Sequence, residues 1–195
     1  TLGMADLLLQ YQIAAAVRGS SPVPLSAALG ELLDWQSQPM PALPPHLQYA
    51  KLGLAGMARE PHWIALWKQV RCEFDVLRGR PLEWVAVAYA DADDVGAPPV
   101  LEVLQAAIDT GCQVLLIDTC QKGPRRLVDR IPPPQLRQLV DRAHFHGLRV
   151  ALAGQIVTGD LPELCATGPD IIAVRGAACE GGNRGSAVSR TAVSG

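Results

Sequence analysis

The 195-residue sequence lacks strong charge of either sign and long hydrophobic runs. Its formal net charge is -2, and no run of lysine and arginine is interleaved with aromatic residues, so nucleic acid is not an expected partner. No apolar stretch approaches the roughly 18 residues that a membrane span requires. The start, Thr1–Met4, also lacks the basic and then apolar order of a secretion signal. These absences predict a cytoplasmic protein without membrane partners.

Clusters of metal-ligating side chains are missing as well. The five cysteines are widely spaced and form no Cys-x-x-Cys pair, so we expect free thiols in the core. The four histidines show no spacing that would direct them at one metal ion. The residues therefore predict no metal site. A Gly-x-Gly-x-x-Gly motif is also absent after the first predicted strand, which disfavours a dinucleotide-binding sheet.

What the sequence does contain is a series of short, apolar, β-rich runs. Segments with helical periodicity separate them, for example Val100–Ile108, and this alternation is typical of successive β-helix-β units. Near-continuous apolar strands fit a parallel sheet that is covered on both faces. The predicted strands are Val23–Leu29, Tyr49–Leu54, Trp84–Tyr89, Val114–Ile117, Arg149–Ala153 and Ile171–Val174.

Polar residues favour a closed barrel over an open sheet, because almost every predicted strand ends in one. In a (β/α) barrel all of these ends meet at one mouth, whereas an open sheet gathers ligand groups mainly at its switch point. We therefore predict an α/β fold of the (β/α)8 TIM-barrel type, in one domain over residues 1–195. The polar residues are Ser26, Lys51, Asp91, Asp118, Gln155 and Arg175.

A closed barrel of this type has eight strands and typically needs about 250 residues. The segment Leu2–Val17 has the pattern of a helix that would follow a strand not present in the sequence. The expectation is a barrel without its first two strands, with a gap between Val23–Leu29 and Ile171–Val174. The exposed strand edges of such a barrel favour association into a homo-oligomer.

Lys51 is the first candidate for chemistry. Alternation places Tyr49, Lys51 and Gly53 on the inner side of their strand. Burial disfavours the charged ammonium group and can produce a Schiff-base nucleophile or a general base. The alternative is a structural lysine that pairs with a carboxylate in the core.

Asp118 and Lys122 form a second candidate pair, at the end of a strand and in the loop that follows. A carboxylate beside an ammonium group can transfer a proton, while the lysine can hold phosphate or stabilise an oxyanion. The alternative is a helix-capping aspartate and a solvated lysine. Asp91 also follows a strand and is a candidate for binding substrate or, more simply, for capping a helix.

Two loops rich in small residues follow the last two predicted strands. Gly154 lies in the first loop, and Arg175 and Gly176 begin the second. Barrels often bind phosphate at these loops, where glycine lets backbone N–H groups approach the anion and an arginine can add a bidentate contact. We predict that they bind a phosphorylated substrate together with Ser26. The alternative is a pair of tight turns with a solvated arginine.

Taken together, these motifs resemble the (5-formylfuran-3-yl)methyl phosphate synthase family over most of the chain. The resemblance implies a (β/α)8 barrel similar to class I aldolases. It also implies a lyase that makes a furan phosphate from two molecules of glyceraldehyde 3-phosphate, for methanofuran biosynthesis, without a metal or organic cofactor. The matching segments are Ser26–Gly30, Tyr49–Gly56, Tyr89–Asp91, Leu116–Thr119 with Lys122, Ala151–Gly154 and Pro169–Cys179.

The resemblance also implies roles for single residues. Lys51 matches the family's proton-transferring lysine, Asp118 and Lys122 match other polar residues of its active site, and the two loops match phosphate-binding loops. The family's Schiff-base lysine lies in an Asp-x-Lys motif before a Gly-Ser-Leu-Gly segment. Thr1–Gly3 resembles the end of that segment, and no Asp-x-Lys motif occurs in these 195 residues. The imine-forming lysine is therefore missing from the sequence.

Two other functions fit the same residues. Another class I aldolase or a phosphosugar isomerase could use Lys51 itself to form the imine. A barrel could also keep its phosphate loops and bind phosphate esters without turnover, because a fold alone does not determine function. Borohydride trapping on Lys51 would indicate the first, and binding without furan product would indicate the second.

Overall fold

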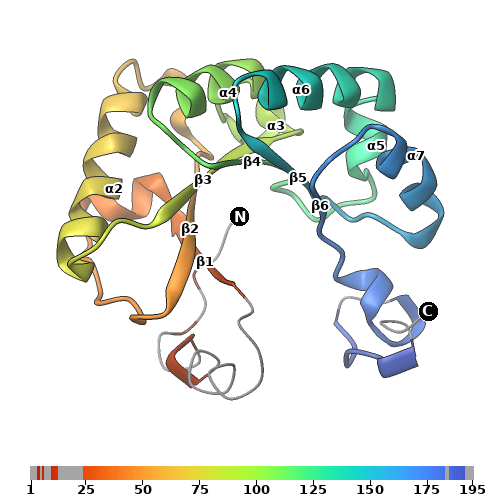
Figure 1. Ribbon diagram of the computed structural model, residues 1–195, viewed down its shortest axis with the longest axis horizontal. Helices are drawn as coiled ribbons and strands as arrows, with labels where there is room; N and C mark the ends of the chain where they lie inside the picture. Colours follow the sequence, from red (N-terminus) through yellow and green to blue (C-terminus); the bar gives the residue numbers. More distant parts are fainter. Residues whose placement is uncertain (1–3, 5, 7–9, 13–23, 183–184, 192–195) are drawn as a thin grey trace.

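The computed structural model describes residues 4, 6, 10–12, 24–182 and 185–191. Its described residues form one curved sheet of six parallel strands that follow one another in sequence order (Figure 1). All six predicted strands are confirmed, with slightly different ends. They are β1 Leu25–Glu31, β2 Leu47–Gly53, β3 Glu83–Tyr89, β4 Val114–Asp118, β5 Arg149–Leu152 and β6 Ile171–Ile172.

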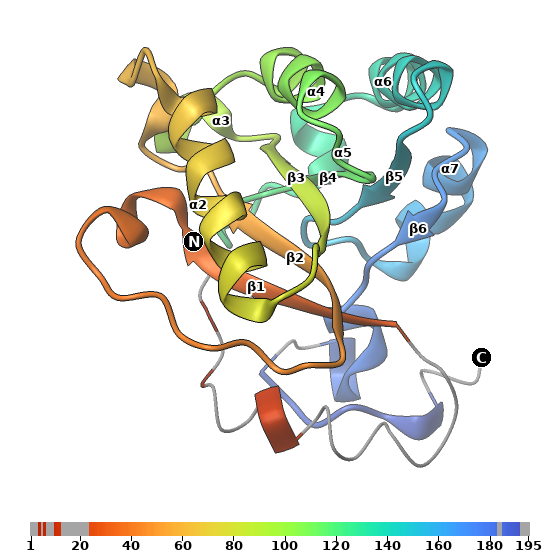
Figure 2. The same cartoon turned by 60° about the vertical axis from the view of Figure 1, so that its left-hand side comes forward.

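Helices cover the convex face of this sheet (Figure 1). α4 and α6 lie side by side in both views (Figures 1 and 2), and Nη2 of Arg142 donates to Oε1 of Gln105 between them at 3.3 Å. The α-helices are α2 Trp63–Arg78, α3 Ala92–Val95, α4 Val100–Asp109, α5 Leu127–Arg130, α6 Pro133–Phe145 and α7 Leu161–Ala166. The 3-10 helices are η1 Leu32–Gln36, η2 Met57–Arg59, η3 Thr158–Asp160, η4 Gly176–Ala178 and η5 Glu180–Gly182.

β3 shows why the strands are continuous apolar runs in the sequence. Trp84 and Ala86 belong to the large core between the sheet and the helices, whereas Val85, Val87 and Tyr89 form part of a smaller core on the concave face. Both faces of the strand are therefore buried, as expected for a parallel sheet. None of the helices in the described ranges is long and apolar enough to cross a membrane.

β1 and β6 are the two edges of the sheet, and no β-pairing joins them within the described residues. This agrees with the expected gap between the first and last predicted strands. What these residues establish is an α/β fold with a six-stranded parallel sheet, and they do not by themselves close an eight-stranded barrel. The predicted helix Leu2–Val17 lies largely outside the described residues.

Strand register sets the depth of each polar side chain on the concave face. Tyr89 pairs with Asp118 at the carboxyl ends of β3 and β4. Lys51 pairs with Val85, four positions before Tyr89 along β3, so it lies deeper on the concave face than Asp118. Lys51 on β2, Tyr89 on β3 and Asp118 on β4 thus lie at different depths on the concave face.

Candidate active site

An open cleft with a volume of about 820 Å³ lies at the carboxyl ends of the strands from β3 to β6. It brings together six of the residues that the sequence singled out: Asp118, Lys122, Gly154, Gln155, Arg175 and Gly176. Ser26, Lys51 and Asp91 do not line it. The rest of the lining consists of Tyr89, Thr119, Cys120, Gly123, Pro124, Arg126, Ala153, Ile156, Val157, Thr158, Ala173, Val174 and Gly182.

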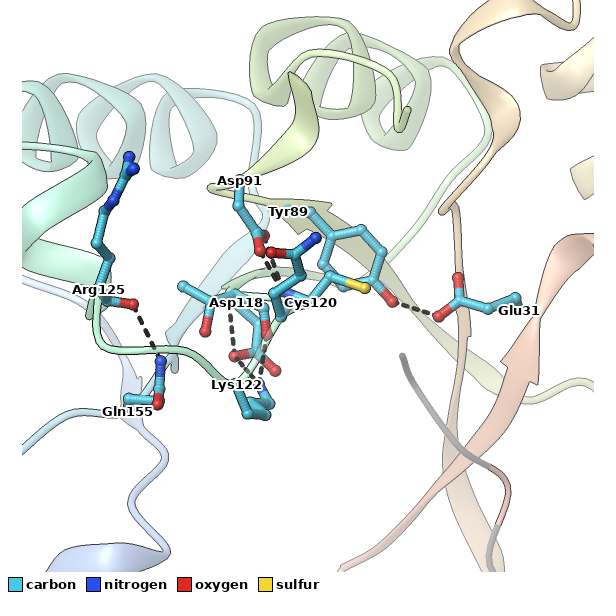
Figure 3. A network of polar contacts seen from close by, with 10 residues as sticks. Glu31, Tyr89, Asp91, Asp118, Cys120, Lys122, Arg125 and Gln155 are labelled. Atoms are coloured by element: carbon cyan, nitrogen blue, oxygen red, sulfur yellow. Dashed lines mark hydrogen bonds and ion pairs between the residues drawn. The ribbon is translucent and has the colours of Figure 1, made fainter. Parts of the chain in front are cut away.

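Asp118 and Lys122 form an ion pair on one wall of the cleft (Figure 3). Oδ1 of Asp118 lies 3.2 Å from Nζ of Lys122 and accepts a hydrogen bond from the backbone N–H of Thr119 at 2.7 Å. Nζ of Lys122 also donates to the carbonyl oxygen of Thr119. Both side chains keep some contact with solvent, so a ligand in the cleft can reach the carboxylate and the ammonium group.

Lys51 lies below this pair and is half-buried. Its Nζ donates to Oγ of Ser26 on β1 at 3.4 Å. Burial lowers the pKa of the Lys51 ammonium group, and the negative charge of Asp118 partly opposes this shift. Lys51 therefore interacts electrostatically with Asp118 in the cleft, although its own side chain does not line the cleft. Ser26 is its hydrogen-bond partner.

Asp91 has a different position from the one expected of a substrate ligand. Its side chain is only 2% exposed, and its two carboxylate oxygens accept hydrogen bonds from the backbone N–H groups of Cys120 and Gln121, each at 2.8 Å (Figure 3). Asp91 precedes α3, yet its carboxylate makes no capping bond to that helix. The structure thus gives Asp91 the task of holding the loop after β4, beside the Asp118 pair.

The loop after β5, which the sequence predicts to bind phosphate, contains two residues with positive φ. Gly154 has φ +115°, and a Cβ placed there would lie only 3.0 Å from Cγ2 of Thr119. Gln155 also has a positive φ, +55°, which is uncommon for a residue other than glycine. The backbone N–H groups of Gly154 and Gln155 donate no hydrogen bond to any other described residue. They remain available to an anion in the cleft.

Arg175 also lines the cleft and is exposed. It forms no ion pair within the described ranges of the chain. Gly176, which follows it, begins η4. An arginine without a carboxylate partner, next to a glycine and a loop with open N–H groups, is suited to bind a phosphate group.

Sequence reasoning missed a buried pair at the edge of the cleft, formed by Glu31 and Tyr89 (Figure 3). Oη of Tyr89 donates to Oε1 of Glu31 at 2.8 Å, and the backbone N–H of Ala55 donates to Oε2 at 2.9 Å. Burial and the charge of Glu31 both raise the pKa of the Tyr89 phenol, so it stays protonated. Alternation along β3 could have assigned Tyr89 to the concave face. Glu31 was missed because the first predicted strand ended at Leu29.

The arrangement can bind a phosphorylated anion and move a proton next to it. Asp118 offers a carboxylate, and Lys122 and Arg175 offer positive charge in the same cleft. These groups can supply acid-base and electrostatic chemistry. Within the described residues, no group of three or more His, Cys, Asp or Glu side chains could hold a metal ion.

A family model and several known proteins resemble this chain. A family model described as 4-HFC-P synthase matches residues 1–195. The (5-formylfuran-3-yl)methyl phosphate synthase of Methanopyrus kandleri is 39% identical over 139 residues, which cover 71% of this chain and 58% of that protein. The synthase of the same name from Methanocaldococcus jannaschii is 42% identical over 137 residues, which cover 70% and 57%. The chain thus matches less than two thirds of the length of these curated relatives.

A solved structure is also similar, the crystal structure of phosphoribosyl anthranilate isomerase from Thermus thermophilus. The TM-score is 0.44 at 20% sequence identity, with 89% of this chain and 72% of that chain covered. The family model, which spans all 195 residues, and the two synthases near 40% identity agree with one another. The chain belongs to the 4-HFC-P synthase family.

Proposed function

We propose that the cleft binds a phosphorylated triose, and that the chain serves the synthesis of (5-formylfuran-3-yl)methyl phosphate from two molecules of glyceraldehyde 3-phosphate. The observation that carries this proposal is the meeting of two kinds of group in one cleft. Asp118 and Lys122 can transfer a proton, and Arg175 with the Gly154 loop can hold a phosphate in the same cleft. Membership of the 4-HFC-P synthase family supports the proposed product, and the condensation that forms it is part of the proposal.

The residues fit an aldol-type lyase that works through an imine. Such a reaction needs a proton acceptor near the reacting carbon and positive charge near each developing oxyanion. Lys51, whose ammonium pKa is lowered by burial, loses its proton more readily than an exposed lysine and can accept one from the substrate. Asp118 can exchange a proton with the same intermediate, while Lys122 balances the charge of the carboxylate.

The imine itself would form on a lysine of an Asp-x-Lys motif, as in the family pattern. The 195 residues contain three lysines, Lys51, Lys68 and Lys122, and none of them lies in such a motif. We therefore propose that these residues provide the phosphate-binding and proton-transferring parts of the site. We also propose that the six-stranded sheet belongs to a (β/α)8 barrel, and that its edges are covered in a homo-oligomer.

The proposal is tested by adding glyceraldehyde 3-phosphate to the 195-residue chain and measuring three things: binding by calorimetry, covalent adducts by mass after borohydride reduction, and furan product. We expect binding without an adduct and without product. The natural protein should form the furan phosphate if its intact mass exceeds 20.8 kDa and the added segment carries the Asp-x-Lys motif. Absence of binding to the chain would contradict the proposal.

A second candidate function is a class I aldolase or phosphosugar isomerase that uses Lys51 as its imine-forming residue. The observation in its favour is the half-buried position and lowered pKa of the Lys51 ammonium group. The same borohydride experiment separates the two functions. An adduct that peptide mapping locates on Lys51 would favour this second function and count against a nucleophile in an Asp-x-Lys motif.

A further inference from the structure

Arg126 lines the cleft, but its guanidinium group is engaged by two carboxylates. Nη1 donates to Oδ1 of Asp160 at 2.7 Å, while Nε and Nη2 donate to the two carboxylate oxygens of Asp129 at 3.2 and 3.3 Å. Arg175, which also lines the cleft, has no comparable partner in the described part of the chain. The proposed function uses Arg175 as an anion ligand and gives Arg126 no task.

Asp160 connects this arginine to the loop after β5. Its side chain is buried, and its second oxygen, Oδ2, accepts a hydrogen bond from the backbone N–H of Val157 at 3.0 Å. One carboxylate therefore holds both the turn before η3 and the guanidinium group of Arg126. The two ends of the contact come from different loops, because Arg126 follows β4 and Asp160 follows β5.

Two further contacts join the same pair of loops. The backbone N–H of Leu127 donates to the carbonyl oxygen of Gly154 at 2.9 Å. Nε2 of Gln155 donates to the carbonyl oxygen of Arg125 at 3.0 Å (Figure 3). The loop after β5 is therefore attached to the loop after β4 at three points. These three contacts involve or flank Gly154 and Gln155, which line the cleft and whose backbone N–H groups have no partner among the described residues.

That segment needs outside support to keep its shape. Gln155 has φ +55°, a left-handed conformation that a residue other than glycine keeps only where its surroundings enforce it. Gly154 approaches Thr119 so closely that a Cβ would fall within 3.0 to 3.2 Å of three of its atoms. The conformation of the anion-binding turn is thus imposed from the loop after β4, to which Arg126 belongs.

We propose that the ion pair between Arg126 and Asp160 is a positioning clamp, which holds the Gly154–Gln155 turn in the conformation that receives the phosphate group of the substrate. The clamp rests on the proposed function, since it takes a phosphate ester as the ligand of the cleft. Arg126 acts here through the loop and does not touch the phosphate, whereas Arg175 contacts it directly.

The test compares the full 195-residue chain with Asp160→Asn, using inorganic phosphate and glyceraldehyde 3-phosphate as ligands in calorimetry. We expect the substitution to raise both dissociation constants about 5- to 30-fold, within the range of couplings between residues that share one network. Amide exchange of Leu127, whose N–H donates to Gly154, should become faster. The Tm should fall only slightly, because asparagine keeps an oxygen that can accept from the N–H of Val157 and Arg126 keeps Asp129 as its partner.

Asp141→Asn is the matched control. It makes the same change of charge and removes the exposed ion pair between Arg137 and Asp141, which is 3.5 Å long and lies on α6. We expect it to alter neither the affinity for phosphate nor the exchange of Leu127. In the double variant Arg126→Gln with Asp160→Asn, the loss of affinity should be no larger than in either single variant.

The outcomes separate the clamp from the proposed function. If the wild-type chain binds phosphate and Asp160→Asn binds it equally well, the clamp is wrong and the proposed function stands. If the wild-type chain binds neither ligand, the proposed function fails and the clamp fails with it. Should Asp160→Asn not fold, Arg126→Gln, which removes the same ion pair from its other end, gives the same comparison, and unchanged affinity overturns the clamp.

Discussion

The amino and carboxyl ends of the sheet present polar side chains in different ways. At the amino end, Nη2 of Arg149 donates to Oη of Tyr49 at 2.7 Å and lies 3.4 Å from Oε2 of Glu83. Gln48 donates to Oε1 of the same glutamate at 2.6 Å. Each of these charges faces a polar partner on another strand of the sheet, so the cluster satisfies itself.

At the carboxyl end the charges are left partly unmatched. Arg175 forms no ion pair among the described residues, and Lys51, deeper on the concave face, has a serine hydroxyl as its hydrogen-bond partner. Asp118 pairs with Lys122 on the cleft wall. The difference favours a structural role for the polar residues at the amino end and, under the proposed function, ligand binding at the carboxyl end, as in barrel enzymes.

Gly53→Ala should have the largest effect, because it would break the packing at the carboxyl end. A Cβ at this position would lie 2.1 Å from Oε2 of Glu31 and 2.4 Å from Oη of Tyr89. We expect the free energy of unfolding to fall by about 3 kcal/mol, the upper part of the usual range for overpacked sites. Urea unfolding measures this loss. Gly123→Ala, where a Cβ meets nothing within 4 Å, should cost much less.

Arg175→Gln should weaken phosphate binding about 10- to 30-fold, close to 2 kcal/mol, because the anion loses its charged donor. Calorimetry with inorganic phosphate measures the change, and the Tm should stay the same since Arg175 has no ion pair to lose. Arg149→Gln at the amino end provides the control and should leave phosphate affinity unaltered. Equal losses of affinity in the two variants would remove the functional difference between the ends.

Tyr89→Phe and Tyr49→Phe compare the same change at the two ends. Loss of the Tyr89 hydroxyl leaves the buried carboxylate of Glu31 with one donor fewer, so we expect about 1 to 2 kcal/mol of destabilisation in urea unfolding. Loss of the Tyr49 hydroxyl affects Arg149, which is well exposed to water, and should cost about 0.5 kcal/mol or less. Similar costs would show that burial does not distinguish the two ends.

The smallest expected effect is a dependence of stability on pH through Lys51. Its pKa in the folded chain is lowered from 10.5 by burial, so the folded chain releases this proton before the unfolded chain does. The free energy of unfolding should therefore rise with pH between the folded pKa and 10.5. Lys51→Met should remove this rise in a series of urea titrations, and Lys68→Met should keep it.

The sequence predicted the strands well because each apolar run is local, and the central strands β3 and β4 are buried on both faces. The pairing of Asp118 with Lys122 could also be predicted, since the two residues lie four positions apart in the sequence at the end of one strand. The expected phosphate loops at Gly154 and Arg175 do meet in one cleft. These features depend on neighbours in the chain or on a general property of parallel strands, whose carboxyl ends lie at one edge.

Contacts between distant segments could not be read from the sequence. Glu31 and Tyr89 are 58 positions apart, and their hydrogen bond depends on the register of three strands. Asp91 was expected either to bind substrate or to cap a helix, and only the folded chain shows its carboxylate holding the N–H groups of Cys120 and Gln121. The pairing of Arg126 with Asp160 likewise requires two loops to be placed in space.

Titration of the isotope-labelled chain with inorganic phosphate, followed by amide NMR, tests the difference between the two ends most directly. We expect saturable changes in the amide chemical shifts of Gly154, Gln155 and Gly176 at the carboxyl end, and none in those of Glu83 or Arg149 at the amino end. Shifts confined to the amino end, or no saturable shift at all, would contradict a phosphate-binding cleft at the carboxyl end of the sheet.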